Sequence, residues 1–140
     1  MTPPINLKAF VAYAVTLILV MALDWLWLRV LARDFYQAQL APILLTQPRL
    51  GAALLFYLVY ALGILIFAVA PTLSGGQWGK AAVNGLLFGF FVYAVYDLTN
   101  LAVLKHWSPG LAALDIAWGS MMTAACAGAA SVAASQISRP

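Results

Sequence analysis

The sequence predicts an all-α membrane protein: a four-transmembrane-helix bundle with a short interfacial helix between helices one and two. Two observations support this fold class. Of the 140 residues, 65% are hydrophobic and 8% are charged, and the mean hydropathy is +0.96. A soluble domain of this size has too little interior to bury so much apolar surface. In addition, four apolar stretches are each close to the ~20 residues that span a bilayer.

The first helix is expected at about 7–29. Lys8 and the apolar run after it resemble a secretory signal, but the Asp24-Trp25-Leu26-Trp27 segment that follows has no small-residue cleavage motif. We therefore interpret this run as a retained span. The other helices are expected at about 50–71, 80–104 and 111–134, separated by turns rich in Pro and Gly. Residues 1–140 then form a single transmembrane domain with both termini on one side.

The segment between the first two spans has a mixed pattern. Between about 34 and 46, apolar residues such as Phe35, Tyr36 and Leu40 alternate with polar ones such as Asp34 and Gln37. This pattern is typical of a short amphipathic helix that lies in the headgroup region of a membrane.

Three of the four acidic residues lie within the predicted spans. Counted along the helices, Asp24 is about 8 Å below Arg29, Asp97 about 12 Å below Lys105, and Asp115 about 8 Å beyond the turn before it. Because the spans alternate in direction, all three carboxyl groups are expected at a similar depth near one membrane face. Carboxyl groups in the hydrocarbon are costly and commonly mark a functional site.

Helical spacing adds further side chains to this acidic cluster. In the third span, Gly85, Gly89, Tyr93 and Asp97 repeat every four residues, a pattern that predicts close helix contact and a face turned to protein. Combined with the faces of the other spans, the predicted ligand-binding residues are Asp24, Tyr57, Tyr60, Tyr93, Asp97, Asn100, Asp115 and Trp118. Thr123 is expected among the few polar groups of the opposite leaflet.

A purely structural role is the alternative for these residues. Burial favours the uncharged form of a carboxyl group, so the aspartates can be protonated and bonded to Tyr or Trp side chains, fixing the helix register. We expect no metal site and no cofactor, because His106 is the single histidine and Cys126 the single cysteine. The scattered basic residues argue against nucleic acid as a partner.

The chain resembles a family of bacterial membrane proteins catalogued as domain of unknown function 2177. The segments that carry the resemblance span nearly the whole chain and include Leu23–Leu28, Phe56–Tyr60, Gly89–Ala102, Trp107 and Asp115–Gly119. Val103 and His106 stand where the family pattern has a Thr and a Gly. The resemblance implies a four-helix protein of the bacterial inner membrane, and it implies no established activity.

Three functional hypotheses follow. The acidic cluster binds a proton, a small cation or an amine-bearing or lipid-like ligand, in a transport-related role. Alternatively, the protein is a structural or accessory subunit of membrane-lipid or stress-response machinery. The third hypothesis is an intramembrane lipid-modifying enzyme, which no sequence feature requires. The bilayer is the expected partner, and a homo-oligomer through the Gly and Ala faces of helices three and four is a further expectation.

Basic residues give the expected orientation in the cell inner membrane. The aspartate side carries four of them (Arg29, Arg33, Arg49, Lys105) and the opposite side three (Lys8, Lys80, Arg139). The positive-inside rule then places the aspartates and the helix 1–2 loop on the cytoplasmic side and the termini in the periplasm.

Overall fold

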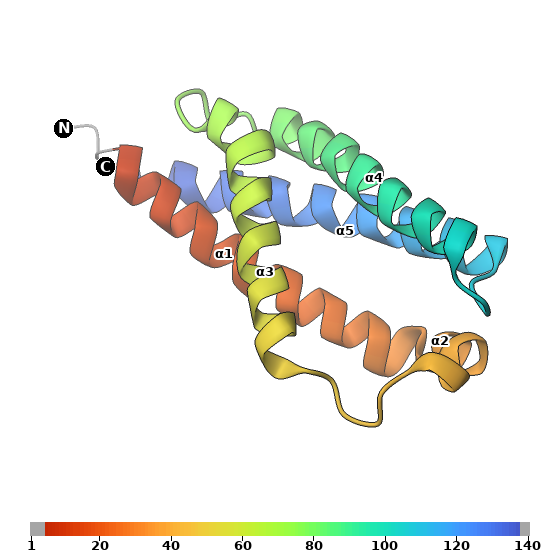
Figure 1. Ribbon diagram of the computed structural model, residues 1–140. Helices are drawn as coiled ribbons and strands as arrows, with labels where there is room; N and C mark the ends of the chain where they lie inside the picture. Colours follow the sequence, from red (N-terminus) through yellow and green to blue (C-terminus); the bar gives the residue numbers. More distant parts are fainter. Residues whose placement is uncertain (1–4, 138–140) are drawn as a thin grey trace.

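The computed structural model describes residues 5–137 as helices joined by short connections, with no strand in that range (Figure 1). Four segments are long and apolar enough to cross a membrane, and they confirm the predicted four-helix fold class. These segments contain α1 (Ile5–Leu26), α3 (Leu50–Ile64), α4 (Trp78–Val103) and α5 (Pro109–Gln136). A short helix, α2 (Arg33–Leu40), lies between the first two spans, also as predicted.

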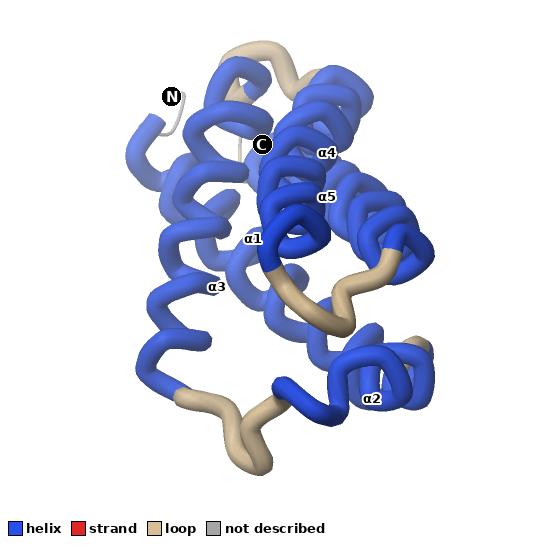
Figure 2. Tube along the Cα trace, turned by 45° about the vertical axis from the view of Figure 1, so that its right-hand side comes forward, coloured by secondary structure: helices blue, strands red, loops and turns tan. Residues whose placement is uncertain are grey.

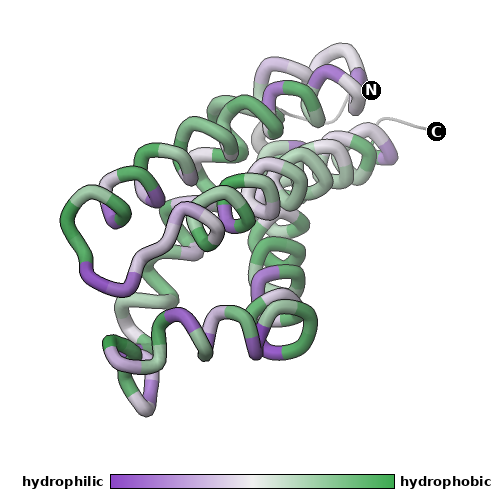
Figure 3. The backbone as a smooth tube through the Cα atoms, turned by 90° about the vertical axis from the view of Figure 1, so that its right-hand side faces the viewer, coloured by the Kyte–Doolittle hydropathy of each residue, from purple (hydrophilic) through white to green (hydrophobic). Residues whose placement is uncertain are grey.

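The outward faces of the long helices are apolar. Large hydrophobic side chains such as Leu50, Phe67 and Phe91 are exposed, in a chain that has few charges to cover them. Figure 3 shows the long helices as mainly hydrophobic, with several hydrophilic positions in α2 and the connections. Such a surface is stable when lipid covers it, so this chain is a multi-pass membrane protein.

Helices α4 and α5 make the most extensive contact in the molecule. A Cβ placed on Gly85 would lie 2.7 Å from the carbonyl oxygen of Thr123 and 2.8 Å from Cβ of Ala127. A Cβ on Gly89 would lie 2.8 Å from the carbonyl oxygen of Gly119. The small-residue face of the third span therefore packs against protein, because only glycine lets the two backbones approach this closely.

Helices α1 and α3 pack on this pair and close the hydrophobic core. Buried residues from all four spans meet there, among them Val20, Ile64, Ala81 and Cys126. The second span reaches the far side through a π-helical turn, η3 (Leu65–Val69), and a 3₁₀ turn, η4 (Ala70–Thr72). Pro71 lies in the first positions of the 3₁₀ turn, where its missing N–H is tolerated.

The junction between α1 and α2 is a second π-helical turn, η1 (Trp27–Leu31), closed by a 2.8 Å hydrogen bond from the N–H of Ala32 to the carbonyl of Trp27. The chain then folds back, so that α2 lies against the bundle end (Figure 2). The buried face of α2 consists of Tyr36 and Leu40, which pack with Leu111 of α5. This helix thus contacts protein as well as any membrane surface.

The predicted interfacial segment 34–46 is not one continuous helix. After α2, a 3₁₀ turn (Ala41–Ile43) holds Pro42 at its start, and Leu44 is extended. Proline at the first position of a helical turn costs no hydrogen bond, whereas proline in the interior of an α-helix removes one. Pro42 is therefore compatible with a new 3₁₀ turn but not with a continuation of α2.

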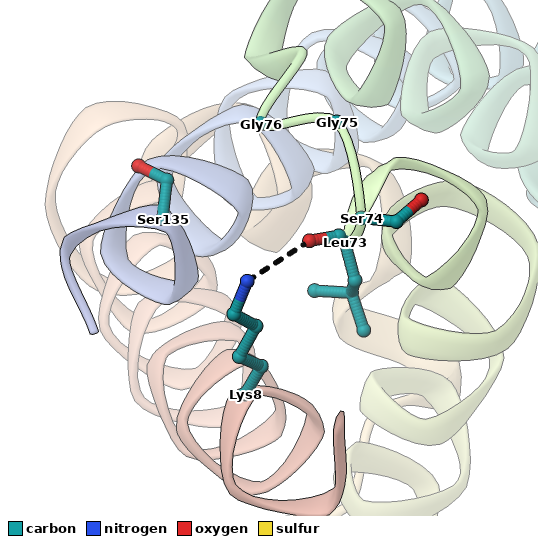
Figure 4. A pocket seen from close by; sticks show the side chains of 6 residues that line it. All are labelled: Lys8, Leu73, Ser74, Gly75, Gly76 and Ser135. Carbon is teal, nitrogen blue, oxygen red and sulfur yellow. Dashed lines mark hydrogen bonds between the residues drawn. The ribbon is translucent and has the colours of Figure 1, made fainter. Parts of the chain in front are cut away.

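The opposite end of the bundle has a cavity of about 220 Å³ between the beginning of α1 and the end of α5. Figure 4 shows Lys8 pointing toward the Leu73 carbonyl, which its Nζ reaches at 3.4 Å. A basic side chain near the last carbonyls of a helix is a common cap. None of the predicted ligand-binding residues lines this cavity, and Arg139 lies outside the described residues.

Candidate functional site

Asp24 and Tyr57 connect the first two spans. Asp24 is buried in α1, and the Tyr57 hydroxyl of α3 donates a hydrogen bond to its Oδ2. The two side chains lie at a similar depth, because Asp24 is seven residues before the end of the first span at Leu31 and Tyr57 is seven residues after the start of α3 at Leu50, about two helical turns in each case. One of the two buried aspartates therefore has a protein donor.

Asp97 and Asp115 form the second part of the cluster, on the antiparallel pair α4 and α5. The Asp97 side chain is completely buried, and its carboxyl group lies within hydrogen-bonding reach of Asp115 and of the indole of Trp107. Nevertheless, neither Asp97 oxygen nor the Trp107 Nε1 has a hydrogen-bond partner of ordinary geometry. Carboxylate oxygens only accept, so the contact between the two acids becomes a hydrogen bond only when one of them carries a proton.

Tyr36 of α2 joins this acidic pair from the membrane end. Its hydroxyl donates a 2.6 Å hydrogen bond to Oδ1 of Asp115 and accepts one of 3.1 Å from Nε1 of Trp27. Burial, together with the hydrogen bond to Asp115 and the charge of that group, raises the pKa of the Tyr36 hydroxyl well above its ordinary value. Tyr36 therefore remains a proton donor over the whole physiological pH range.

Aromatic rings fill the space around the acids. Trp27 and Trp118 stack with ring centroids 4.4 Å apart and planes inclined by only 4°. The ring of Tyr93 lies directly over Gly119 and meets Tyr60 edge to face at 6.1 Å. The Nε1 of Trp118 is buried without a hydrogen-bond partner. The cluster thus contains buried polar atoms that have no hydrogen-bond partner within the described residues.

Two of the predicted site residues are bonded to groups other than the acids. Tyr60 is hydrogen-bonded at 2.6 Å to Thr123, whose own hydroxyl donates to the Gly119 carbonyl, so Tyr60 is the donor. Thr123, expected among the polar groups of the opposite leaflet, is thus in contact with a predicted site residue. Asn100 interacts with Tyr96 on its own helix rather than with an aspartate.

The three aspartates are near one another without forming a metal site. Asp24 and Asp115 are close enough for their charges to interact, as are Asp97 and Asp115. Among residues 5–137, however, no group of three or more His, Cys, Asp or Glu side chains is arranged to hold a metal ion. The donors that reach Asp24 and Asp115 are tyrosines rather than Arg29 or Lys105.

Sequence reasoning missed three side chains that contact the cluster. Trp27 and Trp107 lie near span ends, where tryptophan commonly meets the lipid interface, yet Trp27 bonds Tyr36 and Trp107 lies against Asp97. Tyr36 was expected only as part of an amphipathic segment. A signal was present, because Ala32, Tyr36 and Leu40 repeat every four residues and all three are buried. That stripe is typical of a helix that packs on protein.

The arrangement supports proton chemistry better than any other. It offers two interacting carboxyl groups and a tyrosine hydroxyl bonded to one of them, and among residues 5–137 no basic side chain is hydrogen-bonded to either acid. Nucleophilic or redox chemistry has no arranged group here; the free thiol of Cys126 is buried elsewhere, among Ala and Met side chains.

Comparison with known proteins gives a family and no closer relative. Neither the curated proteins nor the solved structures yielded a match to this chain. The family model described as predicted membrane protein (DUF2177) matches residues 9–132, which include most of each of the four spans and every residue of the acidic cluster. The four apolar helices agree with that description. The chain therefore belongs to the DUF2177 family of membrane proteins.

Proposed function

We propose that this protein binds an exchangeable proton between Asp97 and Asp115, and that this step serves a transport-related process at the membrane. The observation that carries the proposal is the contact between a wholly buried, unpartnered carboxyl group and a second one. Two like charges about 4 Å apart repel by about 4 kcal/mol at an effective dielectric constant of about 20. A shared proton removes this repulsion and supplies the missing donor.

A hydrogen bond from Tyr36 supports this proposal. Tyr36 belongs to α2, outside the four spans, and its hydroxyl donates directly to Oδ1 of Asp115. The same hydroxyl accepts from the indole N–H of Trp27, which only donates, so Tyr36 orients Asp115 beside Asp97 and does not itself carry the proton. Buried acids within membrane spans are typical of proton relays.

A proton fits the site better than the other ligands considered. A small cation needs more oxygen ligands than the two adjacent carboxyl groups supply. The hypotheses of an accessory subunit and of a lipid-modifying enzyme have no specific contact in their favour among the described residues. Gly85 and Gly89 are occupied by contacts within the chain, so a homo-oligomer would use other small residues of α4 and α5 and stays a prediction.

Infrared difference spectroscopy in lipid bilayers tests the proposal. The wild-type protein at neutral pH should show the carbonyl band of a protonated carboxyl group, and the band should shift in heavy water because the proton exchanges. Asp97→Asn and Asp115→Asn should each remove it. Asp34→Asn is the matched control, because Asp34 lies outside the four spans and is exposed on α2.

The two asparagine variants should remain folded, because an amide can donate a hydrogen bond to the carboxylate that is left. A wild-type spectrum without the band would refute the proposal. The same conclusion would follow if the band survived in both Asp97→Asn and Asp115→Asn.

A further inference from the structure

A shallow apolar hollow lies between α1 and α3, separate from the acidic pair. It measures about 290 Å³ and is lined by Met21, Leu50, Ala53, Leu54 and Tyr57. Its one polar side chain, Tyr57, directs its hydroxyl to Asp24. An occupant therefore meets hydrocarbon and an aromatic ring, with no free hydrogen-bonding side chain.

The hollow opens toward lipid near one membrane face. Leu50 and Leu54 are 79% and 52% exposed, and both lie on helices that span the bilayer. Leu50 begins α3, whereas Tyr57 is seven residues further along, which is about 10 Å at 1.5 Å per residue. The hollow thus extends from the membrane surface into the hydrocarbon, as the upper part of an acyl chain does.

A basic residue adjoins this hollow in the sequence. Arg49 directly precedes Leu50, is exposed, and has an extended backbone just before the helix. Arginine binds phosphate oxygens strongly because its planar group donates two parallel hydrogen bonds. Because Arg49 is at the membrane end of α3, its side chain can reach the phosphate of a lipid whose acyl chain lies in the hollow.

We propose that this hollow is a binding site for one anionic phospholipid, with an acyl chain against Tyr57 and Leu54 and the headgroup phosphate at Arg49. The charge at Arg49 favours an anionic headgroup over a zwitterionic one. A volume of about 290 Å³ is at the lower end of the range for small-molecule sites, so the hollow holds part of one chain. The site is independent of the proton proposed for Asp97 and Asp115.

Native mass spectrometry of the delipidated protein tests this proposal. The probes are phosphatidylglycerol and phosphatidylcholine with identical acyl chains, and oleate as a free fatty acid. We expect one tightly bound phosphatidylglycerol, with phosphatidylcholine about fivefold weaker, since one arginine near a membrane contributes about that factor. Arg49→Gln should abolish the preference. Lys80→Gln, a charge change on a different span, should retain it.

Filling the hollow tests the position of the acyl chain. Ala53→Phe should weaken phosphatidylglycerol binding about tenfold, the effect of displacing about two methylene groups. Ala52→Phe is the matched control, because Ala52 is the neighbouring residue, is exposed, and does not line the hollow. Circular dichroism confirms that each variant is folded, and Arg49→Gln tests the proposal without altering the packing.

Several outcomes would overturn the proposal. Equal affinity of the wild-type protein for the two phospholipids would remove the role of Arg49. Equal binding by Ala53→Phe and Ala52→Phe would remove the acyl chain from the hollow. Oleate that binds as tightly as phosphatidylglycerol would assign the hollow to a free fatty acid instead.

Discussion

Replacement of Gly85 by alanine should destabilise the protein, because this glycine sets the distance between α4 and α5. An alanine Cβ there would lie 2.7 Å from the Thr123 carbonyl oxygen, 2.8 Å from Cβ of Ala127 and 3.1 Å from Cα of Ala124. Two of these three atoms, the Thr123 carbonyl oxygen and Cα of Ala124, belong to the backbone of α5. They cannot rotate away as the end of a flexible side chain can.

The structure gives the size of the effect. Ordinary van der Waals contact begins at 3.4 Å, so the two helices must separate by about 0.7 Å at this point (3.4 minus 2.7). Overpacking of this kind costs about 1–3 kcal/mol. Replacing glycine by alanine within a helix also stabilises the helix by about 1 kcal/mol, which offsets part of this cost. The net loss of unfolding free energy is therefore at most about 2 kcal/mol.

A control variant separates these two effects. Gly79→Ala lies on the same helix, and a Cβ there has no atom within 4 Å. It should show the helix-propensity gain alone. The measurement is the free energy of unfolding in mixed micelles, followed by circular dichroism, for wild-type protein and both variants. The difference between Gly79→Ala and Gly85→Ala should be about 1–3 kcal/mol, the overpacking cost by itself.

Equal stability of the two alanine variants would refute this reasoning. It would mean that α4 and α5 are not in backbone contact at Gly85, and the small-residue stripe would need another explanation.

Three further substitutions test individual contacts. Tyr36→Phe removes the hydrogen bond to Asp115. It should lower the free energy of unfolding by about 0.6–1.7 kcal/mol and speed hydrogen exchange in α2. The control Tyr96→Phe changes an exposed side chain and should leave hydrogen exchange in α2 unchanged. Ser108→Ala removes the acceptor for the Leu111 N–H at the start of α5 and should cost about 1 kcal/mol of unfolding free energy; a loss no larger than that of Ser135→Ala would contradict the cap. His106→Gly should raise the unfolding free energy by about 1 kcal/mol, because His106 has a φ of 66° that glycine adopts without strain, and an unchanged value would speak against that backbone conformation.

The sequence was sufficient to predict the fold class and the face of the third span. Apolar length identifies spans because lipid leaves few alternatives to a helix. A repeat of Gly85, Gly89 and Asp97 at multiples of four fixes one face of one helix, and this inference needs no knowledge of the partner. All three residues are buried in the structure.

Contacts between different helices were harder to predict. An even number of spans was enough to expect Asp24, Asp97 and Asp115 near one membrane face, and the structure brings their charges within interaction range. It was not enough to pair Tyr57 with Asp24 or Tyr36 with Asp115, since pairing depends on helix rotation and crossing. Whether these residues bind a ligand stays a prediction.

The positions of Trp27 and Trp107 show a general limit. A tryptophan near the end of a span is compatible with the lipid interface and with a protein contact, and its sequence position is the same in both cases. Trp25, which is 60% exposed, fits the first case. Its near neighbour Trp27 stacks on Trp118 instead.

The π-helical turn at Trp27–Leu31 lets the first span carry one residue more than an α-helix with the same number of turns. The hydrogen bond from Ala32 to Trp27 encloses this extra residue. Deleting one residue within the turn would leave an α-helical turn, and the chain after it would keep about the same direction toward α2. Deleting one residue within the regular part of α1, which has no extra residue, would instead rotate everything after it by about 100° and carry Tyr36 away from Asp115. A single deletion should therefore be tolerated better at this junction than within α1.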